Sequence, residues 1–203
     1  YANIFAEIFS GVKNVLSEGE ERSGDIVTTI EPTVQNTLEK ELQSIMDKYH
    51  PELAQGIIMN PQTGEIYAMG KFPNFDLNDF SNVYDVETFS NSLVENVYEF
   101  GSVVKPLVIA AGIDSGALTA ATPFYDKGSV TVGDREIWNF DKRGRGQITM
   151  QDVLSESLNT GMVFAEQKIG KQKFHDYMTD YRLGEKTNID LPNEAKGLTA
   201  NLD

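Results

Sequence analysis

One apolar run, residues 103–113, constrains the fold of this chain more than any other segment. Nearly every position in it is apolar, which predicts a buried helix. Pro106 disfavours helical geometry in Lys105, and because this conflict is mildest in a first turn, the helix is expected to begin near Ser102. Gly116 is a suitable residue to end it. The start of this helix therefore has a defined place in the fold, and it carries both a serine and a lysine.

Ser102 and Lys105 form the pattern Ser-x-x-Lys. A serine becomes a good nucleophile only when a base takes its proton, and residues at i and i+3 share one face of a helix. The helix dipole would stabilise a developing negative charge, and apolar neighbours of Lys105 would favour its neutral, basic form. The same two residues also suit a plain helix cap and a lysine whose charged end reaches water.

The four-residue pattern alone is not specific, since about one match is expected by chance in a chain of this size. Ser10-Gly11-Val12-Lys13 is a second copy. It lies in residues 1–25, where apolar residues at helical spacing precede an acidic stretch rich in glycine and serine. We interpret residues 1–25 as an extension or linker and expect no catalytic role for this copy.

A second polar pair distinguishes the two copies. Ser157-x-Asn159 is the only Ser-x-Asn in the sequence, and it falls at a predicted junction between two helices. A hydroxyl and a carboxamide placed there could both face a cleft, relay a proton and hold a substrate amide. Ordinary polar capping of the helix ends is the alternative.

Composition excludes several classes of function. The net charge of −14 disfavours nucleic acid and anionic lipid surfaces as partners. The chain has no cysteine, and its two histidines are far apart, so neither a disulfide nor a metal site is expected. Gly144-Arg145-Gly146 lacks the lysine and the spacing of phosphate-binding loops, so no cofactor is expected.

The remaining pattern predicts an α/β chain. Pro32 suits the first turn of a helix that Pro51 stops, and this helix has an apolar stripe. Long loop regions inside a domain are usually functional. In the first half of the chain we expect a strand at 26–30, this helix, and a β-hairpin of 56–59 and 65–69. A long loop region at 72–97 should follow, packed down by aromatic side chains that include Phe80 and Tyr84. In the second half we expect the helix near 102–116, a turn-rich segment at 126–146 with Trp138, and helices at 150–158 (capped by Thr149), 161–169 and 171–181.

Taken together, these motifs resemble those of penicillin-binding proteins, and their surroundings are similar to the monofunctional (class B) transpeptidases. Ser102-x-x-Lys105 is followed 55 residues later by Ser157-x-Asn159. The flanking segments that share the resemblance are Thr28-Thr29-Ile30-Glu31-Pro32 with Gln35, Asn60-Pro61-x-Thr63-Gly64-Glu65-Ile66-x-Ala68-Met69, Phe89-x-Asn91 leading to Tyr98-Glu99-x-Gly101, and Asp190-Leu191-Pro192-x-Glu194-x-x-Gly197. The resemblance covers residues 25–203 and implies that 26–203 are the N-terminal portion of such a transpeptidase domain, with a helical lobe and part of an antiparallel sheet.

The resemblance implies a peptidoglycan D,D-transpeptidase that acts on stem peptides ending in D-Ala-D-Ala. Ser102 would be the nucleophile and Lys105 its general base. Ser157 would pass the proton to the leaving amine, and Asn159 would hold the substrate amide. β-Lactam antibiotics would acylate Ser102, and proteins of the cell-wall synthesis machinery are further possible partners. A membrane-anchored protein facing the cell wall, on the extracytoplasmic or periplasmic side, is the implied location.

Two departures from the family pattern stand out. Phe100 occupies a position where the family usually has proline. The third motif of the family, Lys-(Thr/Ser)-Gly, is absent, and Lys186-Thr187-Asn188 lies too early to replace it. We therefore expect the isolated chain to be an incomplete and inactive portion of the domain.

Two other functions fit part of the pattern. A β-lactamase or β-lactam sensor of the same fold would share Ser102-x-x-Lys105, and a non-catalytic transpeptidase-like scaffold would share the fold alone. The motifs do not distinguish between the septal, lateral and sporulation wall as the target. The acceptor amine and the oligomeric state also stay open.

Overall fold

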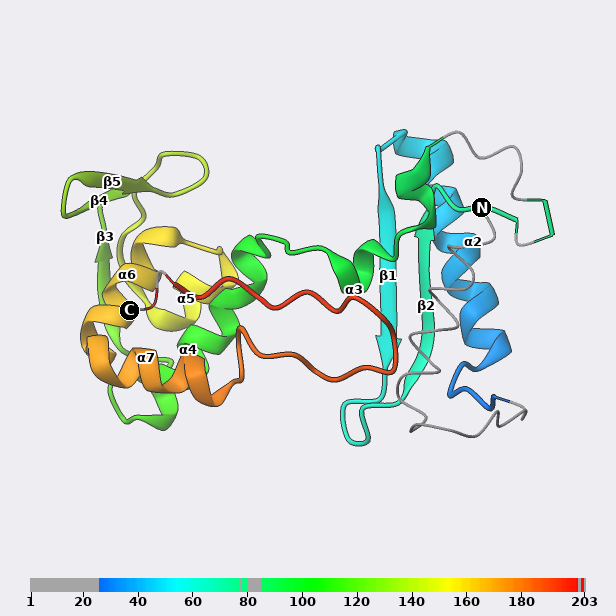
Figure 1. The fold of residues 1–203 in the computed structure, drawn as a ribbon. Coiled ribbons are helices and arrows are strands. Elements are labelled where there is room, and N and C mark those ends of the chain that lie inside the picture. Colours follow the sequence, from blue (N-terminus) through cyan, green and yellow to red (C-terminus); the bar gives the residue numbers. More distant parts are fainter. Residues whose placement is uncertain (1–25, 77, 80–84, 201, 203) are drawn as a thin grey trace. The chain divides into compact units, whose positions relative to one another are not determined.

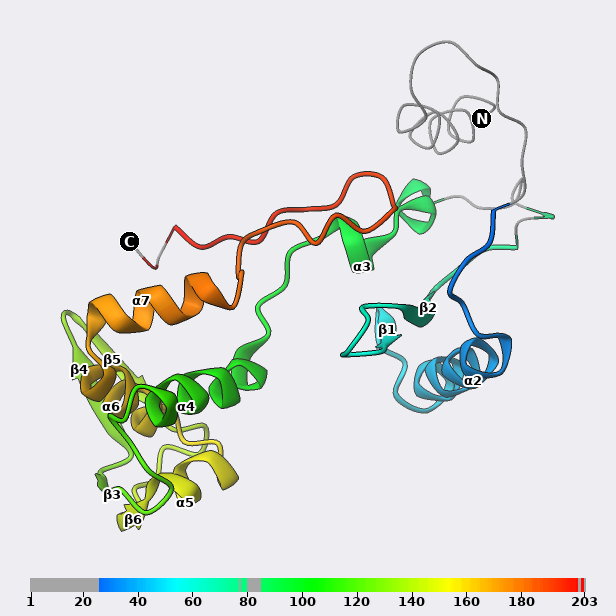
Figure 2. The same ribbon diagram turned by 90° about the horizontal axis from the view of Figure 1, so that it is seen from below.

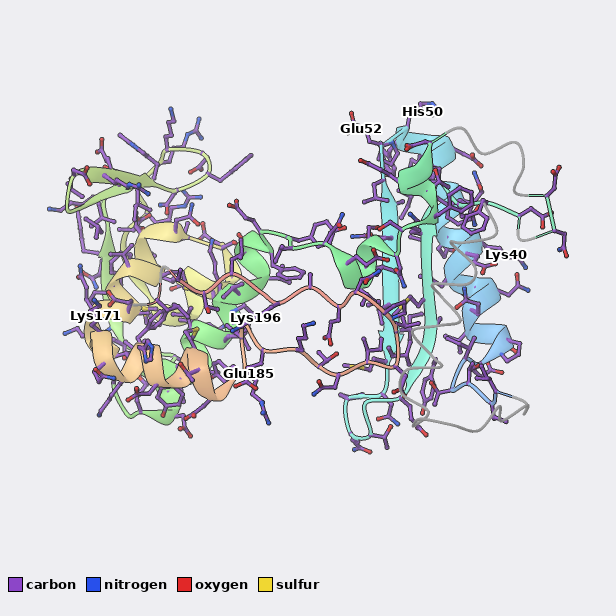
Figure 3. The ribbon with its side chains drawn as sticks, viewed as in Figure 1. Lys40, His50, Glu52, Lys171, Glu185 and Lys196 are labelled. Carbon is purple, nitrogen blue, oxygen red and sulfur yellow. The ribbon has the colours of Figure 1, made fainter. Side chains whose placement is uncertain are left out.

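The computed structural model of the chain describes residues 26–76, 78–79, 85–200 and 202. The expected extension at 1–25 lies outside these residues, as do Phe80 and Tyr84. The chain divides into two compact units. Unit 1 holds the described residues up to Val97 together with 186–195, and unit 2 holds residues 98–185 and those from 196 on (Figure 1). Figure 3 labels Glu185 and Lys196, the residues at which the chain leaves unit 2 and returns to it.

Unit 1 is built on a helix and a β-hairpin. Helix α2 (Pro32–Tyr49) begins with its proline in the first turn, and Glu31 caps it by accepting a hydrogen bond from the amide of Val34. Strands β1 (Ala54–Met59) and β2 (Ile66–Phe72) pair antiparallel, which confirms the predicted hairpin. Helix α2 runs beside this hairpin in both views (Figures 1 and 2).

Two glycines of the hairpin face α2. Gly56 of β1 is paired with Gly70 of β2. A Cβ atom at Gly56 would lie 3.0 Å from the Cδ1 of Leu38, and one at Gly70 would lie 3.4 Å from the Cδ1 of Leu42. A side chain at Gly56 would therefore crowd Leu38, whereas a Cβ at Gly70 would be in ordinary van der Waals contact with Leu42, which is buried at 5% exposure.

The expected apolar stripe of α2 is buried only in part. Leu42 is the buried residue of the helix, whereas Ile45 and Tyr49 remain 41% and 65% exposed. The predicted strand at 26–30 was wrong, since these residues have no strand pairing in the structure. Thr29 instead donates its hydroxyl to the carbonyl of Ile66, and the amide of Glu31, the next residue but one, donates to the carbonyl of Tyr67.

The predicted loop region after β2 contains two short helical turns, η1 (Val86–Phe89) and α3 (Ser92–Glu95). Phe75 and Phe89 pack edge to face with ring centroids 4.7 Å apart, as the aromatic content of the loop suggested. Ser92 donates its hydroxyl to Gln55 of β1, and the amide of Ala195 donates to the carbonyl of Val94. The segment 186–195 thus belongs to unit 1.

Unit 2 is a cluster of helices with short strand pairs. Its elements are η2 (Gly101–Val104), α4 (Lys105–Asp114), β3 (Pro123–Asp126), β4 (Ser129–Val132), β5 (Arg135–Trp138), β6 (Gly146–Thr149), α5 (Met150–Ser155), α6 (Asn159–Ile169) and α7 (Lys171–Asp180). The expectation of a turn-rich segment at 126–146 missed its strands, because β3 pairs with the distant β6 and only β4–β5 is a local hairpin. Each of these strands has four residues, too short for a clear alternating pattern.

The helices of unit 2 confirm the sequence prediction with shifted ends. Helix α5 is shorter than expected and ends at Ser155, while Thr149 caps it in a reciprocal capping box with Asp152. The core lies where α4, α5 and α6 meet. Its larger buried cluster consists of Val108, Ile109, Leu118, Met150, Val153, Leu158 and Ala165, and a smaller one of Ala111, Ile169 and Met178. Helices and antiparallel strand pairs together confirm the α/β class.

Candidate active site

The predicted helix start at Ser102 is confirmed, although its first turn is a 3-10 turn. Gly101 has a positive φ of 59° and opens η2, and the amide of Lys105 donates to the carbonyl of Ser102 at the transition into α4. Ser102 is exposed, so its hydroxyl is accessible. The expected burial of the whole apolar run was wrong on one side of the helix and at its ends, since Pro106 and Ala110 are exposed, Val103 is 70% exposed and Ile113 is 51% exposed.

Lys105 is buried at 8% exposure, in contrast to most lysines. Its side-chain nitrogen, Nζ, donates hydrogen bonds to the carbonyl oxygen of Ser157 and, over 3.0 Å, to the Ser157 hydroxyl. Burial lowers the pKa of Lys105 below its ordinary value, because removal from water disfavours the charged form. The expected desolvated lysine is therefore present, and its partner is the serine of the second motif.

The second motif lies in the turn between α5 and α6. Ser157 adopts a left-handed conformation with φ 57°, which a non-glycine residue seldom takes. The amide of Leu158 donates to the carbonyl of Val153 over 2.9 Å, and the Leu158 side chain is buried in the core at 2% exposure. The turn is thus held by the main chain and by an apolar anchor.

Asn159 is the first residue of α6, at the predicted helix junction. Its side-chain amide donates to the carbonyl of Trp138 over 2.8 Å, at the end of β5. The structure therefore brings Lys105 and Ser157 into direct contact and places Ser102 one turn before Lys105. Asn159 is bonded to a different segment.

Sequence reasoning missed a buried polar cluster behind this motif, formed by Asp126, Asn139 and Thr160. Their exposures are 1%, 2% and 3%. The Asp126 carboxylate accepts hydrogen bonds from Thr160 Oγ1 (2.8 Å), from Asn139 Nδ2 (2.9 and 3.1 Å) and from the amides of Gly128 (2.9 Å) and Arg145 (3.0 Å). Burial alone would raise the pKa of Asp126, but these hydrogen bonds outweigh it and hold the pKa below its usual value.

Two glycines were the only sequence signal for this cluster. A Cβ at Gly128 would lie 2.7 Å from the amide nitrogen of Gly144, and one at Gly144 would lie 2.8 Å from the carbonyl oxygen of Asp126. The two loops therefore cross in backbone contact, which glycine alone permits. Spacing in the sequence gives no indication that these loops meet.

Among the described residues, no group of three or more histidine, aspartate or glutamate side chains could hold a metal ion. The helices in the described part of the chain are also too short or too polar to cross a bilayer.

Comparison with known proteins identifies the family. The sequence model described as "Penicillin binding protein transpeptidase domain" matches residues 55–202. The chain belongs to this transpeptidase family. The penicillin-binding protein relatives include Stage V sporulation protein D of Bacillus subtilis, which is 34% identical over 86% of this chain, and the peptidoglycan D,D-transpeptidase MrdA of Acinetobacter baumannii, 29% identical over 71%. The family model and these relatives together identify the chain as part of a class B penicillin-binding protein, which confirms the prediction from the motifs.

A solved penicillin-binding protein shares the fold. The structure of Pseudomonas aeruginosa PBP2 in complex with WCK 5153 matches 86% of this chain with a TM-score of 0.72 and 26% identity, and the match covers 41% of that protein. The chain spans 27% and 24% of the lengths of the Bacillus and Acinetobacter relatives.

Proposed function

We propose that the protein is a serine-type peptidoglycan D,D-transpeptidase, with Ser102 as nucleophile and Lys105 as its general base. The observation that carries the proposal is the contact between the buried amine of Lys105 and the Ser157 hydroxyl, one helical turn after the exposed Ser102. One relative is named a peptidoglycan D,D-transpeptidase, which supports the same reaction here.

The state of Lys105 suits a base. A neutral amine has two N–H bonds and one lone pair. The two hydrogen bonds to Ser157 use both N–H groups and leave the lone pair to accept a proton. The lowered pKa of Lys105 raises the neutral fraction at a given pH.

The reaction then follows in two transfers. As the Ser102 oxygen attacks the penultimate D-Ala carbonyl, its proton passes to the Lys105 amine. The proton passes on through the Ser157 hydroxyl to the departing amine, so the C–N bond breaks and free D-Ala leaves. An amine of a second stem peptide attacks the acyl-serine, loses its proton along the same path and regenerates the Ser102 hydroxyl.

Asn159 is proposed to hold the amide of the acylated substrate. In the structure its own amide group is bonded to the Trp138 carbonyl, and this bond fixes the orientation of the side chain. β-Lactams would acylate Ser102 as substrate mimics. The same proposal places the protein on the cell-wall face of the membrane and assigns residues 26–203 to one portion of the transpeptidase domain. It also includes contacts with proteins of cell-wall synthesis.

Labelling with a fluorescent penicillin tests the proposal. The native gene product should form a stable adduct, and peptide mass spectrometry should find it on Ser102. Ser102→Ala should abolish labelling, while Ser10→Ala, in the second Ser-x-x-Lys copy, should label as the wild type does. An adduct on another residue would overturn the assignment. Steady hydrolysis of the penicillin would point to a β-lactamase, and failure to react would point to a scaffold.

A further inference from the structure

The turn that carries Ser157 is held from both sides by one loop. On its N-terminal side, Arg145 donates from Nε to the Glu156 carboxylate over 2.9 Å. On its C-terminal side, Asn159 donates to the Trp138 carbonyl, and Thr160 donates its hydroxyl to Asp126. Residues on both sides of Ser157 thus bond to the strands and loop of 126–145.

The buried polar cluster connects these two contacts. Asn139 directly follows Trp138, and its side-chain oxygen accepts a hydrogen bond from the Thr160 amide over 3.3 Å. The Asp126 carboxylate binds Asn139, Thr160 and the Arg145 amide together. A displacement of Asp126 or Thr160 would therefore move Trp138, Asn159 and the turn between them.

A left-handed turn at a non-glycine residue costs energy and needs such support. A strained backbone conformation of this kind persists only where contacts with the surrounding structure hold it in place. Because Lys105 bonds both the carbonyl and the hydroxyl of Ser157, the geometry at the lysine depends on the same turn. A shift of the turn would therefore change both contacts of Lys105 together.

We propose that Asp126 and Thr160 are positioning residues that hold the Ser157–Asn159 turn, and through it the Lys105 amine, in the geometry needed for acylation. The kinetic test of this inference rests on the proposed function, whereas a second test, by tryptophan fluorescence, needs no enzymatic activity. Neither residue would touch the substrate, since both are buried behind the motif.

The variants are Thr160→Val, which removes the hydroxyl and keeps the shape, and Thr160→Ser, which keeps the hydroxyl. Thr149→Val is the matched control, because it also removes a hydroxyl bonded to an aspartate, at the cap of α5. Thr160→Val should slow acylation by penicillin roughly tenfold, which corresponds to about 1.4 kcal/mol of barrier. Thr160→Ser and Thr149→Val should stay within about twofold, although Thr149→Val lowers Tm as a lost cap does.

The only tryptophan of the chain supplies the second readout. Trp138 is 41% exposed and adjoins Asn139, so quenching of its fluorescence by acrylamide reports on the loop in this 203-residue chain. Thr160→Val should increase the quenching, and the other two variants should leave it unchanged. If penicillin does not react with the wild-type native gene product, the proposed function fails, and the fluorescence test still decides the positioning role. Equal quenching and equal acylation in Thr160→Val and Thr149→Val would overturn that role.

Discussion

The Lys105 amine donates a hydrogen bond to the Ser157 hydroxyl over 3.0 Å, joining residues that are 52 positions apart in the chain. This contact links the start of α4 to the turn before α6. It places a buried amine beside a hydroxyl, and the exposed Ser102 precedes that amine by one turn. Two predictions concern Lys105, and two concern the packing of a helix within each unit.

The first concerns Lys105 as the base. Lys105→Met keeps an unbranched side chain, one atom shorter than lysine, and has no amine to accept a proton. Acylation by penicillin should fall roughly 10²- to 10⁴-fold, the usual contribution of a general base. The rate of labelling with a fluorescent penicillin measures the loss, and a circular dichroism melt shows that the variant is folded. A folded variant that acylates within about tenfold of the wild-type rate contradicts the role, since that loss is below the usual contribution of a general base.

The second prediction is the pH dependence that follows from the lowered pKa of Lys105. Acylation needs the neutral amine, so its rate should rise with pH, with a midpoint below the ordinary pKa of lysine. In the unfolded chain this lysine has its ordinary pKa, so between the two pKa values the unfolded state binds more protons. The free energy of unfolding should therefore increase with pH across that window. Lys105→Met should remove this increment in urea titrations run at several pH values, and an unchanged pH slope would contradict it.

The third prediction concerns the attachment of α2 to the hairpin. The Gln35 side chain donates to the carbonyl of Met69 over 3.0 Å and accepts from its amide over 2.9 Å. Gln35→Ala should cost about 1–3 kcal/mol, because it leaves two half-buried main-chain groups without this partner. Gln43→Ala is the control on the same helix, since Gln43 bonds only the exposed carboxylate of Asp47 among the described residues and should cost under about 0.5 kcal/mol. Urea denaturation compares the two, and equal losses would contradict the proposed role of Gln35.

The fourth prediction concerns the crossing of α5 and α6. A Cβ at Gly161 would lie 2.2 Å from the Cγ1 of Val153, which is fully buried. Gly161→Ala should therefore destabilise the protein by about 1–3 kcal/mol through overpacking. Val153→Ala should relieve the overlap, so the double variant should lose less stability than the sum of the single variants. Strict additivity in a double-mutant cycle would show that the two positions do not clash.

Local signals predicted much of the fold. Pro32 and the reciprocal cap of Thr149 and Asp152 mark helix starts through contacts within one turn, and the hairpin of β1 and β2 surrounds a short turn. The strands of 123–149 were not predicted, because β3 finds its partner about twenty residues away in β6 and each strand is too short to show a period. The expected strand at 26–30 failed for a related reason, since β-propensity alone does not supply a pairing partner.

Sequence alone singled out the residues that we propose to carry the chemistry: Ser102 and Lys105 at a helix start, and Ser157 and Asn159 at a helix junction. These are local patterns, and residue type and spacing express them directly. Only the tertiary structure decided that Lys105 bonds Ser157 and that Asp126, Asn139 and Thr160 lie buried behind their turn. Such contacts join segments that are distant in the chain. They form because a buried polar group loses its hydrogen bonds to water and must bond to another polar group of the protein.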